Sequence, residues 1–261
     1  MTEFVTSSDD TRIAYDRLGS GPSVILVGGA MQFRAFDPQT RQLAARLAEQ
    51  GFTVVNYDRR GRGESGGRGP YVLDSEIADL RALIAELGGP AALFGSSSGG
   101  AICLAAAAAG LPVSKLALWE VPLGPELGTD GAEFLAGLQE QIASGDEEAT
   151  IAFYMRDMPP EWVETARQGP AWPIMKAVSP SLAPDAEALA WTQSRPRAEL
   201  WSSVRIPVLV LVGEETLPFF TAAAESIVAS VSDGRSTRVP ATNHSWELGP
   251  MVDVLAEFFA A

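Results

Sequence analysis

The chain has 261 residues, 46% of them hydrophobic and 20% charged, which is enough for one large α/β domain or for a domain with an inserted subdomain. Its 33 acidic and 19 basic residues give a formal net charge of -14, which argues against nucleic acid and anionic membrane surfaces as partners, because both require basic patches. One cysteine, Cys103, excludes a disulfide framework and a cysteine-rich zinc site, and one histidine, His244, excludes a multi-histidine metal site.

The N-terminal residues lack the basic start and the apolar core of a signal peptide, and no apolar run is long enough to cross a bilayer. We therefore expect a soluble cytoplasmic protein that does not bind membranes. The sequence leaves open whether the chain is a monomer or a homodimer.

The first half of the chain alternates predicted strands with predicted helices. Strands are expected at 2–5, 11–17, 24–27 and 53–57. A helix is expected after Asp37, its N-cap, with Pro38 as its first residue, and Asp74 is expected to cap a second helix. This alternation predicts a parallel, doubly wound sheet with right-handed crossovers.

The stretch 93–100, Leu-Phe-Gly-Ser-Ser-Ser-Gly-Gly, is predicted to be a strand, a sharp turn and the start of a helix. Gly95 and Gly99 flank Ser97 in a Gly-x-Ser-x-Gly pattern, the nucleophile elbow, in which the serine sits on a strained turn with its Oγ exposed above a sheet. Glycine suits both positions because a Cβ atom would crowd a tight strand-to-helix crossing. Taken alone, the stretch could also be a Ser/Gly-rich loop without chemistry.

The alternation stops after a predicted strand at 115–119, which ends at Glu120. Residues 122–204 contain helical segments and several prolines but no convincing strand, and we interpret them as a helical cap inserted after the sixth strand. The pattern then resumes with strands at 208–213 and 235–239 and helices at 217–229 and 252–259. The α/β core is therefore expected to comprise residues 1–121 and 205–261.

Ser97 and His244 are the candidate nucleophile and base. A serine hydroxyl is a poor nucleophile at neutral pH, so it needs a base within hydrogen-bond reach. His244 is the only histidine and hence the only imidazole that could serve. The alternative is that it is a loop histidine without a catalytic role.

These motifs and their order resemble the α/β-hydrolase superfamily. Gly28-Gly29-Ala30 follows the third strand, where relatives often carry His-Gly-x. Residues 58–65, Asp-Arg-Arg-Gly-Arg-Gly-Glu-Ser, match the Asp-x-Arg-Gly-x-Gly-x-Ser turn after the fourth strand. The resemblance covers essentially the whole chain. It implies the α/β-hydrolase fold, a mostly parallel sheet of about eight strands with helices on both faces and an inserted helical cap.

The resemblance also implies an oxyanion hole and a triad acid. The oxyanion hole would consist of the backbone N–H groups of Ala30 and Ser98. Relatives usually place the acid after the strand that follows the cap, but Thr216 occupies that position here. Some members carry it instead after the strand that follows the elbow helix, where this chain has Glu120, and we predict Glu120 as the acid. Glu215 and Glu214 remain alternatives, as does the absence of a triad acid.

Together these residues predict a serine hydrolase that cleaves a carboxylic ester, lactone or thioester of a small, partly apolar substrate through an acyl-enzyme on Ser97. No cofactor and no metal are expected. Epoxide hydrolases and dehalogenases of this superfamily use an aspartate at the elbow, so Ser97 argues against both. Two alternatives stay open: acyl transfer or cyclisation on the same acyl-enzyme, and a non-catalytic ligand-binding member of the fold.

Two other patterns carry less weight. Residues 61–66 fit Gly-x-Gly-x-x-Gly, but they do not follow the first strand of a βαβ unit, so we interpret the arginines of this turn as structural links between loops. The aromatic and methionine residues of the cap are interpreted mainly as its core, with a few lining an apolar substrate pocket.

Overall fold

The structure is a computed structural model that describes residues 1–67 and 71–261. In these residues nine strands form one sheet in the order β1-β2-β4-β3-β5-β6-β7-β8-β9. The strands are β1 (Glu3–Thr6), β2 (Arg12–Leu18), β3 (Ser23–Val27), β4 (Thr53–Tyr57), β5 (Ala91–Ser96), β6 (Val113–Trp119), β7 (Val208–Glu215), β8 (Gly234–Thr242) and β9 (Ser245–Trp246).

The helices of the described residues are α1 (Pro38–Glu49), α2 (Leu73–Glu86), α3 (Ser98–Ala108), α4 (Asp130–Ser144), α5 (Glu147–Tyr154), α6 (Pro160–Gln168), α7 (Trp172–Val178), α8 (Ala183–Trp191), α9 (Arg197–Leu200), α10 (Pro218–Ser230) and α11 (Leu248–Ala260), with a short 3₁₀ helix at Ser179–Leu182. The predicted fold class, a mostly parallel α/β sheet with helices on both faces, is confirmed.

The strands from β4 through β3, β5, β6 and β7 to β8 pair in parallel, whereas β1, β2 and β9 pair antiparallel. The register aligns the carboxyl ends of the central strands, because Val27 pairs with Gly95, Ser96 with Trp119, and Trp119 with Leu211. The loops that follow these strands therefore meet at one edge of the sheet, where ligand sites of open α/β folds lie.

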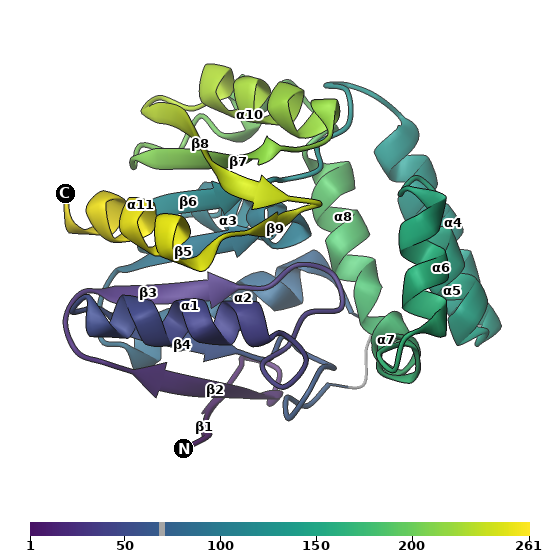
Figure 1. The fold of residues 1–261 in the computed structure, drawn as a ribbon, viewed down its shortest axis with the longest axis horizontal. Coiled ribbons are helices and arrows are strands. Elements are labelled where there is room, and N and C mark those ends of the chain that lie inside the picture. The colour runs from purple at the N-terminus through teal and green to yellow at the C-terminus, as the bar shows by residue number, and fades with distance from the viewer. Residues whose placement is uncertain (68–70) are drawn as a thin grey trace.

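Helices cover both faces of the sheet, each over its own apolar cluster (Figure 1). One face packs against α2, α3 and α10, and the other against α1 and α11. The helix after the elbow, α3, is buried along nearly its whole length, as expected for an alanine-rich segment between a sheet and a second layer of helices.

Two predicted N-caps have different outcomes. The Asp37 side chain accepts a hydrogen bond of 2.9 Å from the Thr40 N–H, so the predicted cap of α1 is confirmed. The Asp74 prediction is wrong, because α2 begins one residue earlier, at Leu73. The Leu73 N–H instead donates to the carboxylate of Glu187 in α8, at 2.6 Å, so a side chain distant in sequence satisfies this helix end.

Residues 122–204 form a helical segment at the carboxyl edge of the sheet, with α8 nearest the strands and α4, α5 and α6 outside it (Figure 1). A cluster of apolar side chains joins this segment to the loop after β3 through Met31. The division into an α/β core and a cap stays a prediction. Within the ranges that the structure describes, no helix is both long and apolar enough to cross a membrane.

The fold needs glycine at position 99 for steric reasons. A Cβ atom there would lie 2.4 Å from the backbone oxygen of Val27 and 2.7 Å from that of Gly28. We expect Gly99→Ala to lower the free energy of unfolding by about 2–3 kcal/mol through overpacking, measured by urea denaturation. Gly249→Ala in α11 is the matched control, since a Cβ there has no neighbour within 4 Å among the described residues. Equal urea midpoints for the two variants would contradict the expectation.

Candidate active site

Ser97 lies at the junction of β5 and α3 with φ 54° and ψ -129°. Such angles are rare for a residue with a side chain and cost on the order of 1–3 kcal/mol, so the surrounding structure must hold them. The Ser97 N–H donates a hydrogen bond of 2.8 Å to Trp119 O, which ties the turn to β6. A Cβ on Gly29 would lie 3.0 Å from Ser97 Cβ, so the loop after β3 lies directly against the serine.

Glu120 and His244, 124 residues apart in sequence, lie side by side in the fold. The distance from Glu120 Oε2 to His244 Nδ1 is 2.5 Å. The other carboxylate oxygen, Oε1, accepts the Gly213 N–H at 2.9 Å, at the carboxyl end of β7. Both residues have positive φ, 39° for Glu120 and 65° for His244, as do many residues held at functional sites.

Glu120 is only 1% exposed, and burial raises the pKa of its carboxyl group. The hydrogen bonds to His244 and Gly213 outweigh burial, so the pKa of Glu120 is lowered from its ordinary value. Thr216 adds to this lowering, although its buried Oγ1 forms no hydrogen bond of ordinary geometry with any residue that the structure describes. The resulting carboxylate favours the tautomer of His244 with a proton on Nδ1, which leaves Nε2 free to accept a proton.

The ring of His244 is held on one side by Phe220. The two rings stack at 4.8 Å between centroids with an interplanar angle of 9°. The Trp119 indole N–H donates to the backbone oxygen of His244 at 3.3 Å, which anchors the loop. The side chain remains 25% exposed, so the imidazole is oriented and still reachable.

Ser97 and His244 both form a hydrogen bond with Trp119, yet no hydrogen bond joins the two residues in the described parts of the chain. Ser97 is bonded instead to Trp119, the residue that precedes Glu120. Catalytic hydrogen bonds often tighten only when substrate binds, so this geometry is compatible with a serine–histidine pair.

The two predicted oxyanion donors flank the same serine. Ser98 is the first residue of α3, and first-turn N–H groups have no acceptor within their helix. The Ala30 N–H, in the loop after β3, donates no hydrogen bond to any residue described. That these two groups form an oxyanion hole stays a prediction.

The alternative acids lie apart from the histidine. Glu214 and Glu215 are both exposed at the end of β7, and Glu215 Oε2 accepts a hydrogen bond from the Thr242 hydroxyl at 3.4 Å. The carboxylate that contacts His244 is that of Glu120.

A sequence model described as "Alpha/beta hydrolase family" matches residues 24–260. The chain belongs to the alpha/beta hydrolase family. An alpha/beta hydrolase from Sphaerobacter thermophilus DSM 20745 is 36% identical, with a TM-score of 0.85 over 98% of this chain and 100% of that one. A hydrolase from Pseudomonas aeruginosa PA01 is 25% identical, with a TM-score of 0.73 over 100% of this chain and 98% of that one.

Two further similarities are narrower. An enol-lactonase from Burkholderia xenovorans LB400 is 19% identical with a TM-score of 0.68, covers 99% of this chain and 98% of its own, and shares the fold. A non-heme haloperoxidase from Rhodococcus erythropolis is 38% identical over 88 residues. That match spans 33% of this chain and only 30% of the relative.

In this hydrolase a buried ionic cluster lies beside the candidate site, and sequence reasoning did not find its key member. Arg59 and Arg62 donate to the backbone oxygens of Gly28 and Gly29, as expected of arginines that link loops. Both also bind the carboxylate of Asp185 in α8. No signal marks Asp185 in the sequence, because it lies in a proline-rich stretch without a motif.

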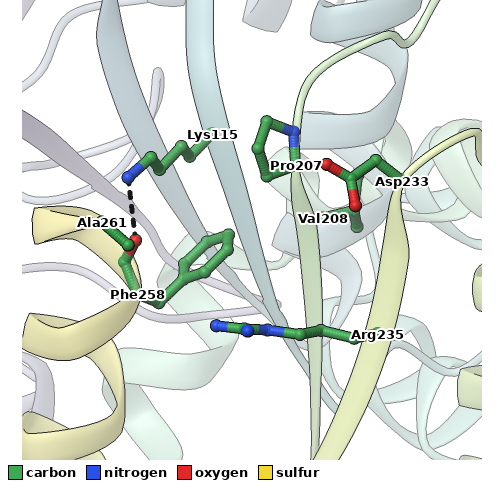
Figure 2. Close-up of a pocket in the computed structure, with 7 residues that line it drawn as sticks. All are labelled: Lys115, Pro207, Val208, Asp233, Arg235, Phe258 and Ala261. Atoms are coloured by element: carbon green, nitrogen blue, oxygen red, sulfur yellow. Dashed lines mark hydrogen bonds between the residues drawn. The ribbon is translucent and has the colours of Figure 1, made fainter.

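A cavity of about 260 Å³ lies at the edge of the sheet of this hydrolase opposite to the one that carries Ser97. Figure 2 shows the residues that line it. It is lined by residues at the amino ends of β6, β7 and β8 and by the end of α11. Lys115 donates to the backbone oxygens of Phe258 and Phe259 there, at 2.9 and 3.0 Å, so this lysine caps a helix terminus. Among the residues described, no group of three His, Cys, Asp or Glu side chains could hold a metal ion.

Proposed function

We propose that this alpha/beta hydrolase cleaves a carboxylic ester, lactone or thioester of a small, partly apolar substrate through an acyl-enzyme on Ser97. The observation that carries the proposal is the buried Glu120 carboxylate on His244 Nδ1, at the same sheet edge as the strained serine. It supports the roles of acid for Glu120, base for His244 and nucleophile for Ser97 in a catalytic triad.

In the proposed mechanism the Ser97 Oγ attacks the acyl carbonyl carbon while its proton passes to His244 Nε2. The negative charge that forms on the carbonyl oxygen is bound by the N–H groups of Ala30 and Ser98, each worth about 3 kcal/mol in the transition state. His244 then protonates the leaving alcohol or thiol as its bond to the acyl carbon breaks. Water, deprotonated by His244, attacks the acyl-enzyme, and Ser97 recovers its proton as the acid departs.

The apolar surroundings of the oxyanion loop support a partly apolar substrate. Ala30 and Phe33 pack against an apolar cluster that includes Trp172, and Phe134 and Tyr154 of the helical segment pack against the same cluster. Pockets that bind small ligands are mostly apolar with a few polar groups. We propose that this cluster lines the acyl or alcohol side of the site and that residues 122–204 act as its cap.

The test is a series of p-nitrophenyl esters of increasing acyl length, combined with labelling by a fluorophosphonate. We expect turnover, a preference for one range of chain lengths, and one label per chain on Ser97, found by mass spectrometry of peptides. Product analysis with added methanol or hydroxylamine separates hydrolysis from acyl transfer. If the protein neither labels nor turns over any ester, the non-catalytic ligand-binding alternative gains support.

A further inference from the structure

We propose that Asp185, in α8, is a positioning residue that holds both donors of the oxyanion hole in place from the helical segment. The inference rests on the proposed function, because it concerns how the same site stabilises the oxyanion. It adds residues that do not contact the reacting atoms, namely Asp185 and the two arginines that bind it.

The carboxylate of Asp185 lies at the centre of a buried network. Its Oδ1 accepts from Arg59 Nη1 at 2.6 Å and from the Ser98 hydroxyl at 2.7 Å. Its Oδ2 accepts from Arg62 Nη2 at 2.6 Å. The side chains of Asp185 and Arg62 are 0% exposed, so water does not compete for these bonds.

Arg62 connects Asp185 to the first donor. The same guanidinium that binds Asp185 donates through Nη1 to the backbone oxygen of Gly29 at 2.7 Å. That carbonyl belongs to the peptide bond that ends in the Ala30 N–H. A trans peptide is planar and its C=O and N–H point in opposite directions, so a guanidinium that fixes the Gly29 oxygen also fixes the direction of the Ala30 N–H. Arg59 adds a longer bond to Gly28 O, at 3.3 Å.

Ser98 connects Asp185 to the second donor. Its hydroxyl donates a hydrogen bond to Asp185. Its backbone N–H, at the start of α3 and directly after the nucleophile, is the proposed second donor of the oxyanion hole. The carboxylate of Asp185 is therefore linked to each oxyanion donor through a single side chain, that of Arg62 for Ala30 and that of Ser98 for its own N–H. Oxyanion donors stabilise the transition state only when their N–H groups point at the developing charge. Small displacements of these donors therefore lower the rate of the chemical step strongly.

The charges of the network explain why an aspartate is needed. Arg59 also pairs with Glu76 at 2.9 Å, so two guanidinium groups face two carboxylates in a buried site. Burial raises the pKa of Asp185, but the charges of Arg59 and Arg62 reverse this and lower it, so the residue is ionised. An asparagine would leave an excess positive charge and would turn one N–H₂ face toward an arginine, which frees Arg62 to shift.

The chain contains a second buried arginine–aspartate pair, which serves as a control because it has no hydrogen bond to the oxyanion loop among the residues described. Arg60, in the same turn, binds Asp79 through Nε at 2.8 Å and Nη2 at 2.7 Å. Asp79 is 0% exposed, like Asp185, and Arg60 also pairs with Asp9. Asp79→Asn therefore removes a buried carboxylate from an arginine without touching the donors.

The experiment compares Asp185→Asn and Asp79→Asn with the wild type in ester hydrolysis and in inhibition by a trifluoromethyl ketone, which forms an oxyanion on serine. For Asp185→Asn we expect kcat to fall by about 10- to 100-fold, KM to change by less than about 3-fold, and the inhibition constant of the ketone to rise in parallel with the loss of kcat. For Asp79→Asn we expect a lower unfolding temperature but kcat within about 3-fold of wild type.

Equal kcat for Asp185→Asn and the wild type, or equal losses in both variants, would overturn the proposal and leave Asp185 a structural residue. If Asp185→Asn does not fold, the variants Ser98→Ala and Arg62→Lys test the proposal instead. Each alters one link between Asp185 and an oxyanion donor and leaves the backbone N–H of that donor in the chain. Each is expected to lower kcat by about 3- to 10-fold with KM unchanged, and wild-type kinetics in both would refute the inference. A wild-type protein that neither labels nor hydrolyses esters contradicts the proposed function itself, and the role of Asp185 falls with it.

Discussion

Replacing Ser97 by alanine is expected to lower kcat for the best ester by about 10⁵-fold or more and to abolish phosphonate labelling. The change removes the proposed nucleophile and leaves the Ala30 and Ser98 donors and the apolar pocket in place. The substrate should therefore still bind. The measurement is steady-state kinetics together with mass spectrometry of the labelled peptide, and residual activity within about 10-fold of wild type would contradict a serine acyl-enzyme.

A second variant at the same position separates chemistry from stability. Ser97 has φ 54°, which glycine adopts without strain, so Ser97→Gly should be as inactive as Ser97→Ala but more stable by roughly 1 kcal/mol in urea denaturation. Ser245→Ala, at an exposed serine on β9, is the matched control and should keep full activity. A stabilised, inactive glycine variant would indicate that strain at Ser97 is maintained for function.

Replacing Glu120 by glutamine is expected to lower kcat by about 10³- to 10⁴-fold. The Gly213 N–H, now 2.9 Å from Oε1, would select the amide oxygen of the glutamine and so turn its NH₂ group toward His244 Nδ1. That donor would force the proton of the imidazole onto Nε2, the nitrogen that must accept the serine proton. The variant also loses the negative charge that stabilises the imidazolium ion.

Glu215→Gln is the control for this prediction. Glu215 is exposed, so its substitution should change kcat by less than about 2-fold. A large loss in Glu215→Gln with near-normal activity in Glu120→Gln would instead place the acid after the strand that follows the helical segment.

The lowered pKa of Glu120 predicts how the stability difference between wild type and Glu120→Gln depends on pH. A carboxyl group whose pKa is lower in the folded than in the unfolded chain stabilises the fold above its unfolded pKa, near 4.5, and loses this contribution as the pH falls through the folded value. The difference in free energy of unfolding between the two proteins should therefore shift against the wild type as the pH falls below about 4.5. A pH-independent difference from neutral pH down to pH ~3 would argue against an ionised, hydrogen-bonded Glu120.

Local patterns in the sequence determined the elements and most of the candidate site. The apolar run at 24–27 and the Asp37-Pro38 start each specify a strand or a helix through the chemistry of neighbouring residues alone. The nucleophile elbow is also specified by residues close in sequence, because the turn requires both Gly95 and Gly99, four positions apart. A single histidine left only one imidazole to consider.

Only the tertiary structure decided which side chains meet. The sequence favoured Glu120 but kept Glu214 and Glu215 as alternative partners of His244. The parallel register of β6 and β7 brings Glu120 to the histidine, while the other two are exposed. Glu187 at the start of α2 and Asp185 beside the elbow carry no local signal. Their contacts join residues 87 or more positions apart, and such pairings depend on how helices and strands pack rather than on the residues adjacent in the chain.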